Sequence, residues 1–251
     1  MTTFQRMLAL TVIVIVTSVV SVRESRGQTQ TLTAFYTAPV VSMAPMWIAK
    51  EAGFFKKQGL DVRLVFIASG PLGTTAILSC EVDVGVIGGF APIRAIAGGA
   101  KNLVIIGQTK NRMTGAIVGK KEMAGVQDLR GKRLGIDRIG SNPDMFSQAA
   151  LSRFQIDPLK DLNYIQLGTI GQGVPALKAG TVDAISTSAP HDLFAQRFGF
   201  KVILDITAMK IPFAATVLLS ARNTVERKQP ELIKFTRAYA EGMHYFLTNR
   251  E

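Results

Sequence analysis

The sequence predicts an α/β protein built from two similar lobes. When the 251-residue chain is shifted by 100 residues against itself, residues 61–104 lie over residues 161–204 without a gap. Eight of the 44 paired positions are identical, among them Val82-Asp83 with Val182-Asp183. Both copies run through an apolar strand, a glycine-containing turn, a short helix and a second strand, a pattern typical of parallel βαβ units. Two such lobes form a cleft between them, and we expect the functional site there.

The composition fits a large folded core and argues against several kinds of site. Apolar residues make up 47% of the chain, within the range of globular proteins. The formal net charge is +11, but the cations are scattered, so we expect a solvated surface and no nucleic-acid partner. Cys80 is the only cysteine, and the histidines, His191 and His244, lie far apart. This excludes a disulfide framework and a multi-cysteine metal site, and we expect neither a metal nor a cofactor.

Residues 1–27 have the pattern of an export signal. Arg6 supplies a positive start, residues 7–22 form an apolar run, and Ser25-Arg26-Gly27 offers small residues for cleavage. The run is shorter than the roughly 20 residues of a membrane span. We therefore expect cleavage near Gly27 and a periplasmic protein, with an uncleaved N-terminal anchor as the alternative.

The first copy and the segment before it predict four strands and three helices. Pro45 precedes one helix and Gly59 ends it, whereas Gly53 inside it predicts either a break or a closely packed neighbour. The expected strands are 31–37, 60–68, 82–87 and 103–107, and the expected helices are 46–57, 72–79 and 90–97.

The rest of the chain repeats this alternation. Strands are expected at 115–119, 133–137 and 214–220, with a short turn or helix at 123–129. The run Gly140-Ser141-Asn142-Pro143 predicts a helix start, with Ser141 or Asn142 as N-cap and Pro143 in the first turn. Two helices, 225–228 and 230–247, follow the last strand. We expect residues 28–113 plus 209–251 in lobe 1 and residues 114–208 in lobe 2, joined by a two-strand hinge.

Glycine- and serine-rich turns at the ends of strands are the first candidates for a binding site. Ser69-Gly70, Gly140-Ser141 and residues 168–173 each precede a helix, where free backbone N–H groups can hold an anion or a polar group. The alternative is that these turns need such residues for backbone reasons alone. Gly88-Gly89 and residues 186–190 lie at the equivalent edge.

Three larger side chains could also contact a ligand. Trp47 and Phe90 could stack on it, although plain helix packing is the favoured explanation of both. Arg138 follows a strand and could bind an anion, or simply be solvated. His191-Asp192 stands at a helix start, where capping is a simpler role than catalysis. No catalytic set is apparent, and we expect no enzyme activity.

Three segments resemble a known family. They are residues 45–62, with the sequence PMWIAKEAGFFKKQGLDV, residues 128–136, with DLRGKRLGI, and residues 180–184, with GTVDA. They are similar to the exported solute-binding components of ABC importers of the nitrate, sulfonate and taurine type, a superfamily shared with pyrimidine-precursor proteins of thiamine synthesis. The resemblance covers residues 31–250. Relatives usually continue beyond the position of Glu251, so we expect a fragment or a shortened form.

The resemblance implies a type II periplasmic-binding-protein fold and a monomer whose partners are a small-molecule solute and an ABC permease in the inner membrane. The alternative is a pyrimidine-precursor synthase-like enzyme on the same fold, although the histidine- and cysteine-rich segment of those enzymes is absent. By position in the motifs and by the turns described above, the expected ligand-binding residues are Ser42, Pro45, Trp47, Ser69, Gly70, Gly88, Gly89, Phe90, Arg138, Gly140, Ser141 and Ser188.

Overall fold

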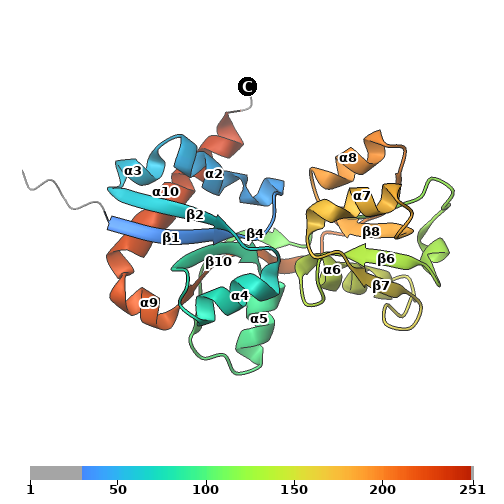
Figure 1. Ribbon diagram of the computed structural model, residues 1–251, viewed down its shortest axis with the longest axis horizontal. Coiled ribbons are helices and arrows are strands. Elements are labelled where there is room, and N and C mark those ends of the chain that lie inside the picture. Colours follow the sequence, from blue (N-terminus) through green and yellow to red (C-terminus); the bar gives the residue numbers. More distant parts are fainter. Residues whose placement is uncertain (1–29, 250–251) are drawn as a thin grey trace, which may run out of the picture. The chain divides into compact units, whose positions relative to one another are not determined.

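Two five-stranded sheets organise the chain in the computed structural model, which describes residues 30–249 (Figure 1). The predicted signal at residues 1–27 lies outside the described residues. The first sheet contains β1 (Gln30–Tyr36), β2 (Leu60–Phe66), β3 (Val84–Gly88), β4 (Leu103–Arg112) and β10 (Pro212–Ala221). The second contains β5 (Ala116–Gly119), β6 (Arg133–Ile136), β7 (Asn163–Gln166), β8 (Ala184–Thr187) and β9 (Lys201–Asp205).

Helices connect the strands and follow the last one. Those associated with the first sheet are α2 (Ala44–Glu51), α3 (Phe54–Lys57), α4 (Gly70–Leu78), α5 (Phe90–Ala97), α9 (Arg222–Arg227) and α10 (Gln229–Thr248). Those associated with the second are α6 (Asn142–Ser152), α7 (Gly173–Lys178) and α8 (His191–Arg197). Three 3-10 turns complete the set: η1 (Val41–Met43), η2 (Val126–Leu129) and η3 (Ile170–Gln172). We call each sheet with its helices lobe 1 and lobe 2.

The two sheets have the same strand order. The first runs β2-β1-β3-β10-β4 and the second β7-β6-β8-β5-β9, so β5 occupies in lobe 2 the place of β10 in lobe 1. Both β10 and β5 are antiparallel to their neighbours, whereas β1 pairs with β3, and β6 with β8, in parallel. The repeat predicted from the sequence is therefore a repeat of βαβ units, and each lobe takes its antiparallel strand from outside that repeat.

The identical residues of the repeat have equivalent roles. The backbone N–H of Thr33 donates to Asp83 Oδ2 over 2.8 Å, and that of Arg133 donates to Asp183 Oδ2 over 3.1 Å. Each aspartate thus accepts a hydrogen bond from a backbone N–H of the strand beside it. A Cβ on Gly73 would lie 2.4 Å from the Phe35 ring, so this helix can approach the sheet only with glycine here.

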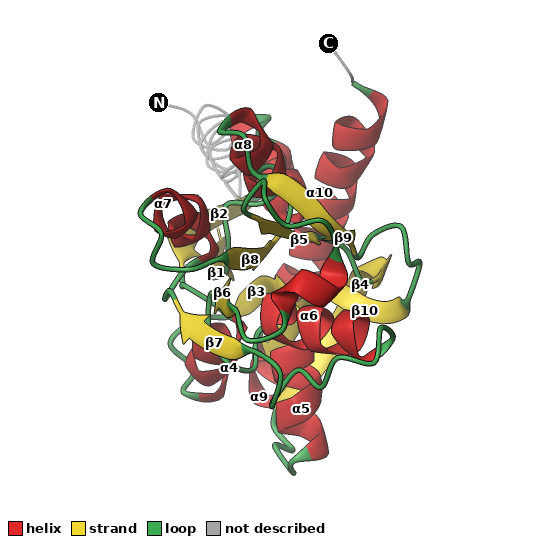
Figure 2. Cartoon of the chain, turned by 90° about the vertical axis from the view of Figure 1, so that its right-hand side faces the viewer, coloured by secondary structure: helices red, strands yellow, loops and turns green. Residues whose placement is uncertain are grey.

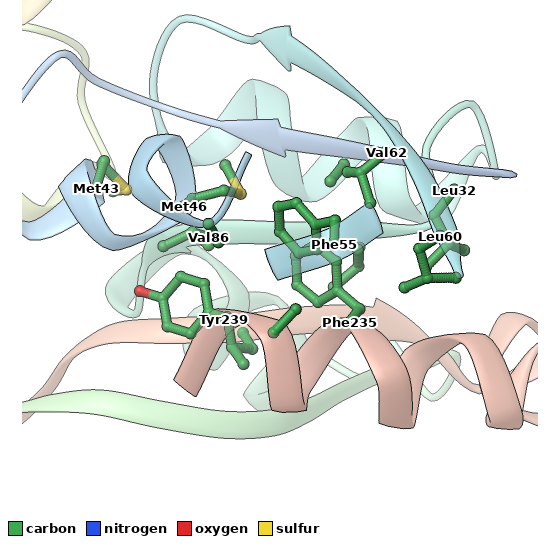
Figure 3. Close-up of a cluster of buried hydrophobic side chains, with 14 of the residues drawn as sticks. Leu32, Met43, Met46, Phe55, Leu60, Val62, Val86, Phe235 and Tyr239 are labelled. Carbon is green, nitrogen blue, oxygen red and sulfur yellow. The ribbon is translucent and has the colours of Figure 1, made fainter. Parts of the chain in front are cut away.

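Each sheet of lobe 1 and lobe 2 is covered by helices on both faces, because its strands are apolar on both sides. In lobe 1, α2, α3 and α10 pack on one face through Met46, Phe55 and Phe235, against Leu32 and Val86 (Figure 3). The Phe55 and Phe235 rings stack with their centroids 5.1 Å apart. On the other face α4 packs through Ala76 and Ile77. Figure 1 shows α4 and α5 on the side of this sheet opposite to α10.

Lobe 2 has the same three layers. Phe146, Ala150 and Leu151 of α6 pack on one face of the sheet, against Ile117 and Leu134. The other face packs against α7 and α8 through the buried side chains of Val174, Leu177 and Ala195. Figure 2 shows α7 and α8 on the side of β8 opposite to α6.

The chain passes between the sheets twice, between β4 and β5 and between β9 and β10. Hydrogen bonds join the two connections: Met113 N donates to Ile211 O over 2.9 Å, and Ile206 N donates to Gly115 O over 3.0 Å. Residues from Thr31 onward form one compact unit. The expected lobe boundaries, after residues 113 and 208, fall within these connections and stay a prediction.

The structure confirms some of the local predictions and differs from others. Gly53 ends α2 and adopts a left-handed conformation, with φ of 75°, so the helix expected over 46–57 is two helices. Ser141 is the N-cap of α6, and its hydroxyl accepts a hydrogen bond from Asp144 N. Strand β4 extends to Arg112 because it pairs along its length with β10. Among residues 30–249, no helix has the length and apolar character needed to cross a membrane.

Candidate functional site

A cavity of about 70 Å³ lies where strands of both sheets end. Thr37 follows β1 and Ser69 follows β2 in lobe 1, while Asp137 follows β6 and Ser188 follows β8 in lobe 2. Carboxyl ends of parallel strands meet at one edge of a sheet, which is why both lobes contribute loops of the same kind. A single water needs about 10–15 Å³ of such space, so the cavity has room for more than one water or for a small bound molecule.

The loops that approach this cavity from lobe 1 have special backbone conformations. Ser69 has a φ of 82°, and its N–H donates to Thr37 O over 3.3 Å. A Cβ on Gly70 would lie 3.2 Å from Ala91 Cβ, tighter than an ordinary contact. These residues bring the start of α4 to the cavity wall.

Serine and threonine provide most of the polar side chains of the wall. Serine and threonine residues of both lobes line it: Thr37, Ser42, Ser69, Thr114, Ser141, Ser186, Thr187, Ser188 and Thr216. Within the described part of the chain, Ser69 Oγ and Thr187 Oγ1 are buried without a hydrogen-bond partner. Buried polar groups normally have partners, so these two hydroxyls are available to a bound molecule.

One carboxylate faces the cavity. Asp137 is only 8% exposed, and the hydroxyl of Ser141 donates to its Oδ1. Burial raises the pKa of Asp137 above the ordinary aspartate value, while the hydrogen bond from Ser141 opposes that rise. The charged form of this group therefore lacks solvation that a ligand could supply.

Asn142 connects the lobes beside the cavity. Its Nδ2 donates to Ala215 O over 2.7 Å, and its Oδ1 accepts from Phe90 N over 3.1 Å. The side chain lies against Gly88, where a Cβ would approach it to 2.7 Å. A third bond, from Val41 N to Ala189 O over 3.1 Å, also joins lobe 1 to lobe 2.

Six of the residues expected from the sequence line the cavity. They come from both lobes and are Ser42, Ser69, Gly70, Gly88, Ser141 and Ser188.

The other six lie outside its lining. Pro45 is buried in the first turn of α2, and the Trp47 ring packs edge-on against Tyr36 at 5.3 Å. Gly89 precedes α5 and packs so close to Ala214 O that a Cβ would lie 1.8 Å away. The remaining three are Phe90, which starts α5, the half-buried Arg138, and Gly140, whose φ is 83°.

Sequence reasoning missed three residues that matter to the cavity. Asp137 was read as the last residue of a strand, and Asn142 as a helix cap. Phe146 belongs to the apolar face of α6 and supplies part of the wall. The repeat held a signal for Asp137, because it stands where Thr37 stands in lobe 1.

His191 is not part of the lining of this cavity, although its backbone N–H donates to Ser188 O over 2.9 Å. Its side chain stands in a separate groove that Val174, Phe194 and Phe198 also line. Its Nε2 is buried and has no partner among residues 30–249, and burial lowers the pKa of the imidazole. In the same described range, no three His, Cys, Asp or Glu side chains lie close enough together to hold a metal ion.

Solved structures share this architecture. The alkanesulfonate-binding protein SsuA from Xanthomonas axonopodis pv. citri, bound to MOPS, superposes with a TM-score of 0.75 at 20% identity, covering 87% of this chain and 75% of SsuA. The periplasmic nitrate-binding protein NrtA from Synechocystis PCC 6803 gives a TM-score of 0.73 at 18% identity, covering 89% of this chain and 66% of NrtA. The predicted fold class, two α/β lobes of the periplasmic-binding type joined by a two-strand hinge, is confirmed.

Relatives by sequence agree. YtlA of Bacillus subtilis (strain 168), a protein that carries the name of a binding protein, is 29% identical over 230 residues, which cover 87% of this chain and 67% of YtlA. The family model described as NMT1/THI5 like matches residues 41–251. The match spans both lobes and the whole cavity wall from Ser42 onward, and this chain therefore belongs to the NMT1/THI5-like family.

Proposed function

We propose that this protein is the exported solute-binding component of an ABC importer. It captures one small solute between its lobes, without chemical change, and delivers it to a permease in the inner membrane. The observation that carries the proposal is the cavity of about 70 Å³, which has walls from both lobes and two buried hydroxyls without partners. A solute that contacts both lobes favours the state in which they are together, and this couples capture to a change of shape.

The comparisons support binding and import. The structural neighbour SsuA is named an alkanesulfonate-binding protein, and NrtA is named a periplasmic nitrate-binding protein. The relative YtlA is also named a binding protein. The periplasmic location that the name of NrtA gives supports export of this chain, in line with the export pattern of residues 1–27. A reporter fused after Gly27 tests export directly, because its activity should appear outside the cytoplasm.

The solute itself is found by native mass spectrometry of the full chain purified from an exporting bacterial host. We expect a noncovalent one-to-one complex with a small molecule that dissociates unchanged. Returning the molecule at 100 times its dissociation constant should add about 2.7 kcal/mol to the free energy of unfolding. Conversion of the molecule into a product would instead support the enzyme alternative, and recovery of the chain without any small molecule would count against the proposal.

A further inference from the structure

The cavity wall carries a single ionisable side chain. Of the residues that line it, all within the described range 30–249, only Asp137 can bear a charge, and neither lysine, arginine nor histidine is among them. An anionic solute in this cavity would face a carboxylate and find no cation to balance it. Removal of two like charges from water without a partner is costly, whereas a cation beside a buried carboxylate replaces its lost solvation.

The fold does not require a carboxylate at this position. Leu167 N donates to Ile136 O over 2.8 Å, as Ile67 N donates to Tyr36 O over 3.0 Å in lobe 1. The next carbonyl, of Asp137 in one lobe and of Thr37 in the other, likewise accepts from the loop that follows the neighbouring strand. Thr37 and Asp137 are therefore equivalent positions, and a threonine meets the same backbone demands.

The local partners of Asp137 leave room for a ligand. Within residues 30–249, Ser141 is the only side chain that donates to this carboxylate. The same Ser141 hydroxyl accepts from Asp144 N and so caps α6. The cap is therefore formed by Ser141 and does not use the carboxylate of Asp137. The unpartnered Ser69 Oγ and Thr187 Oγ1 add two oxygens to the same cavity, and a protonated nitrogen has several N–H donors to share among such acceptors.

Lys110 and Arg138 are not paired with Asp137. Lys110 is not among the lining residues; its Nζ donates to Oγ1 of the lining residue Thr114 over 3.0 Å, and burial lowers the pKa of its ammonium group. Arg138 is adjacent in sequence to Asp137, but its side chain is not part of the lining. Neither forms an ion pair with Asp137.

We infer that the solute presents a protonated nitrogen, such as an ammonium or amidinium group, to the carboxylate of Asp137. This inference rests on the proposed function, since it names the chemical class of the molecule that the cavity captures. It sets this chain apart from its structural neighbours SsuA and NrtA, which by name bind sulfonate and nitrate anions.

Three probes of nearly the same size and shape test the charge preference: acetamidinium, acetamide and acetate, with nitrate as a fourth. Each is titrated into the full chain by calorimetry at one pH and a constant ionic strength. We expect acetamidinium to bind at least about tenfold more tightly than acetate or nitrate, a difference of about 1.4 kcal/mol. Neutral acetamide should fall between them.

Two substitutions of Asp137 separate its charge from its place in the fold. Asp137→Asn keeps the shape, and Asp137→Thr installs the residue that the equivalent position of lobe 1 already accommodates. In both we expect the preference for acetamidinium over acetamide to shrink to about twofold or less. Glu226→Gln, which removes an exposed carboxylate on α9, should leave the preference unchanged. Thermal unfolding of all variants confirms that each is folded.

The outcomes distinguish this inference from the proposed function. Tighter binding of acetate or nitrate than of acetamidinium overturns the inference and leaves solute capture standing. An acetamidinium preference that survives in both Asp137 variants also overturns it. If none of the four probes binds, and mass spectrometry finds an anion retained by the chain, the inference fails alone. If no probe binds and no molecule is retained, both fail.

Discussion

Asp183 ties together three parts of lobe 2. Its carboxylate accepts from Arg133 Nε over 2.9 Å, from Arg133 N over 3.1 Å and from Lys120 Nζ over 2.6 Å, and its side chain is 15% exposed. The guanidinium of Arg133 lowers the pKa of Asp183 well below the ordinary aspartate value, and Lys120 adds to this effect. The carboxyl group of Asp183 therefore binds a proton less tightly in the folded state than in the unfolded chain.

This pKa shift predicts how stability depends on pH. Because the pKa is lower in the folded state, the stabilising contribution is complete above the unfolded value of about 3.9 and is lost as the pH falls through the acid range. Asp183→Asn should lower the free energy of unfolding at pH 7 by about 1–2 kcal/mol, the scale of a charge-assisted hydrogen bond near the surface. Urea unfolding from pH 7 to pH 3 should show a smaller loss of stability for the variant than for the wild type.

Asp61→Asn serves as the control for this experiment. Asp61 is 61% exposed and lies 3.6 Å from Lys50, so its loss should change neither the stability at pH 7 nor the acid slope by more than about 0.5 kcal/mol. If the free energy of unfolding fell equally between pH 7 and pH 3 in Asp183→Asn and in the wild type, the pKa of Asp183 would not be lowered by its ion pairs, which would contradict the prediction.

Single residues were only partly predictable from the sequence. Ser69, Gly70 and Gly88 could be found because turns between strands and helices reveal themselves by composition, and they line the cavity. The directions of longer side chains depend on packing that spacing does not encode. Trp47 belongs to the core on the Tyr36 side of α2, and Asn142, chosen as a cap, reaches across to Ala215 in the other lobe.

At the scale of elements, α10 is held against α2 by a close contact at Gly242. A Cβ at this position would lie 2.4 Å from Pro45 O and 3.0 Å from Ala49 Cβ. Both atoms belong to α2 and neither is the end of a flexible side chain, so the two helices would have to separate.

Gly242→Ala should therefore lower the free energy of unfolding by about 1–3 kcal/mol, the usual cost of overpacking. Urea denaturation followed by circular dichroism measures this loss. Gly171→Ala is the matched control, because a Cβ there meets only Thr169 Oγ1, at 3.8 Å, and should change stability by less than about 0.5 kcal/mol. Equal stability of the two variants would contradict the close packing of α10 on α2.

The order of elements was the part of the fold that the sequence predicted best. Apolar runs punctuated by glycine and proline predicted the βαβ alternation of both lobes. The break between α2 and α3 was one of the two outcomes that Gly53 predicted. The equivalent positions of β10 in the first sheet and β5 in the second could not be predicted, because strands that pair over a long sequence distance leave no local pattern. The length of β4 has the same cause, since its second half exists only beside β10.

At the scale of the whole molecule, Asn142 stabilises the state in which the lobes are together. It satisfies one backbone donor, Phe90 N, and one backbone acceptor, Ala215 O, both in lobe 1. These two hydrogen bonds form only when the lobes are in contact. Removal of the amide therefore destabilises that state and leaves the separated state unchanged.

Asn142→Ala should weaken capture of the solute that copurifies with the chain. Two hydrogen bonds contribute about 1–3 kcal/mol to the state that binds it, which corresponds to a loss of roughly five- to 150-fold in affinity. Calorimetry measures the affinity, and small-angle X-ray scattering should give a larger radius of gyration for the variant than for the wild type. Asn163→Ala, on the exposed edge of lobe 2, should match the wild type in both measurements.

The claim that the lobes close on a solute is tested most directly by a distance measured between them. Spin labels at Lys56→Cys in lobe 1 and Lys121→Cys in lobe 2 use two exposed positions. Cys80→Gly removes the native thiol at a residue with φ of 59°, where its lobe 2 equivalent, Gly180, has φ of 68°. Pulsed electron paramagnetic resonance measures the distance between the two spin labels. In protein freed of solute the distance distribution should be longer and broader, and after the copurifying solute is returned it should be shorter and narrower. Identical distributions in the two samples would contradict the account.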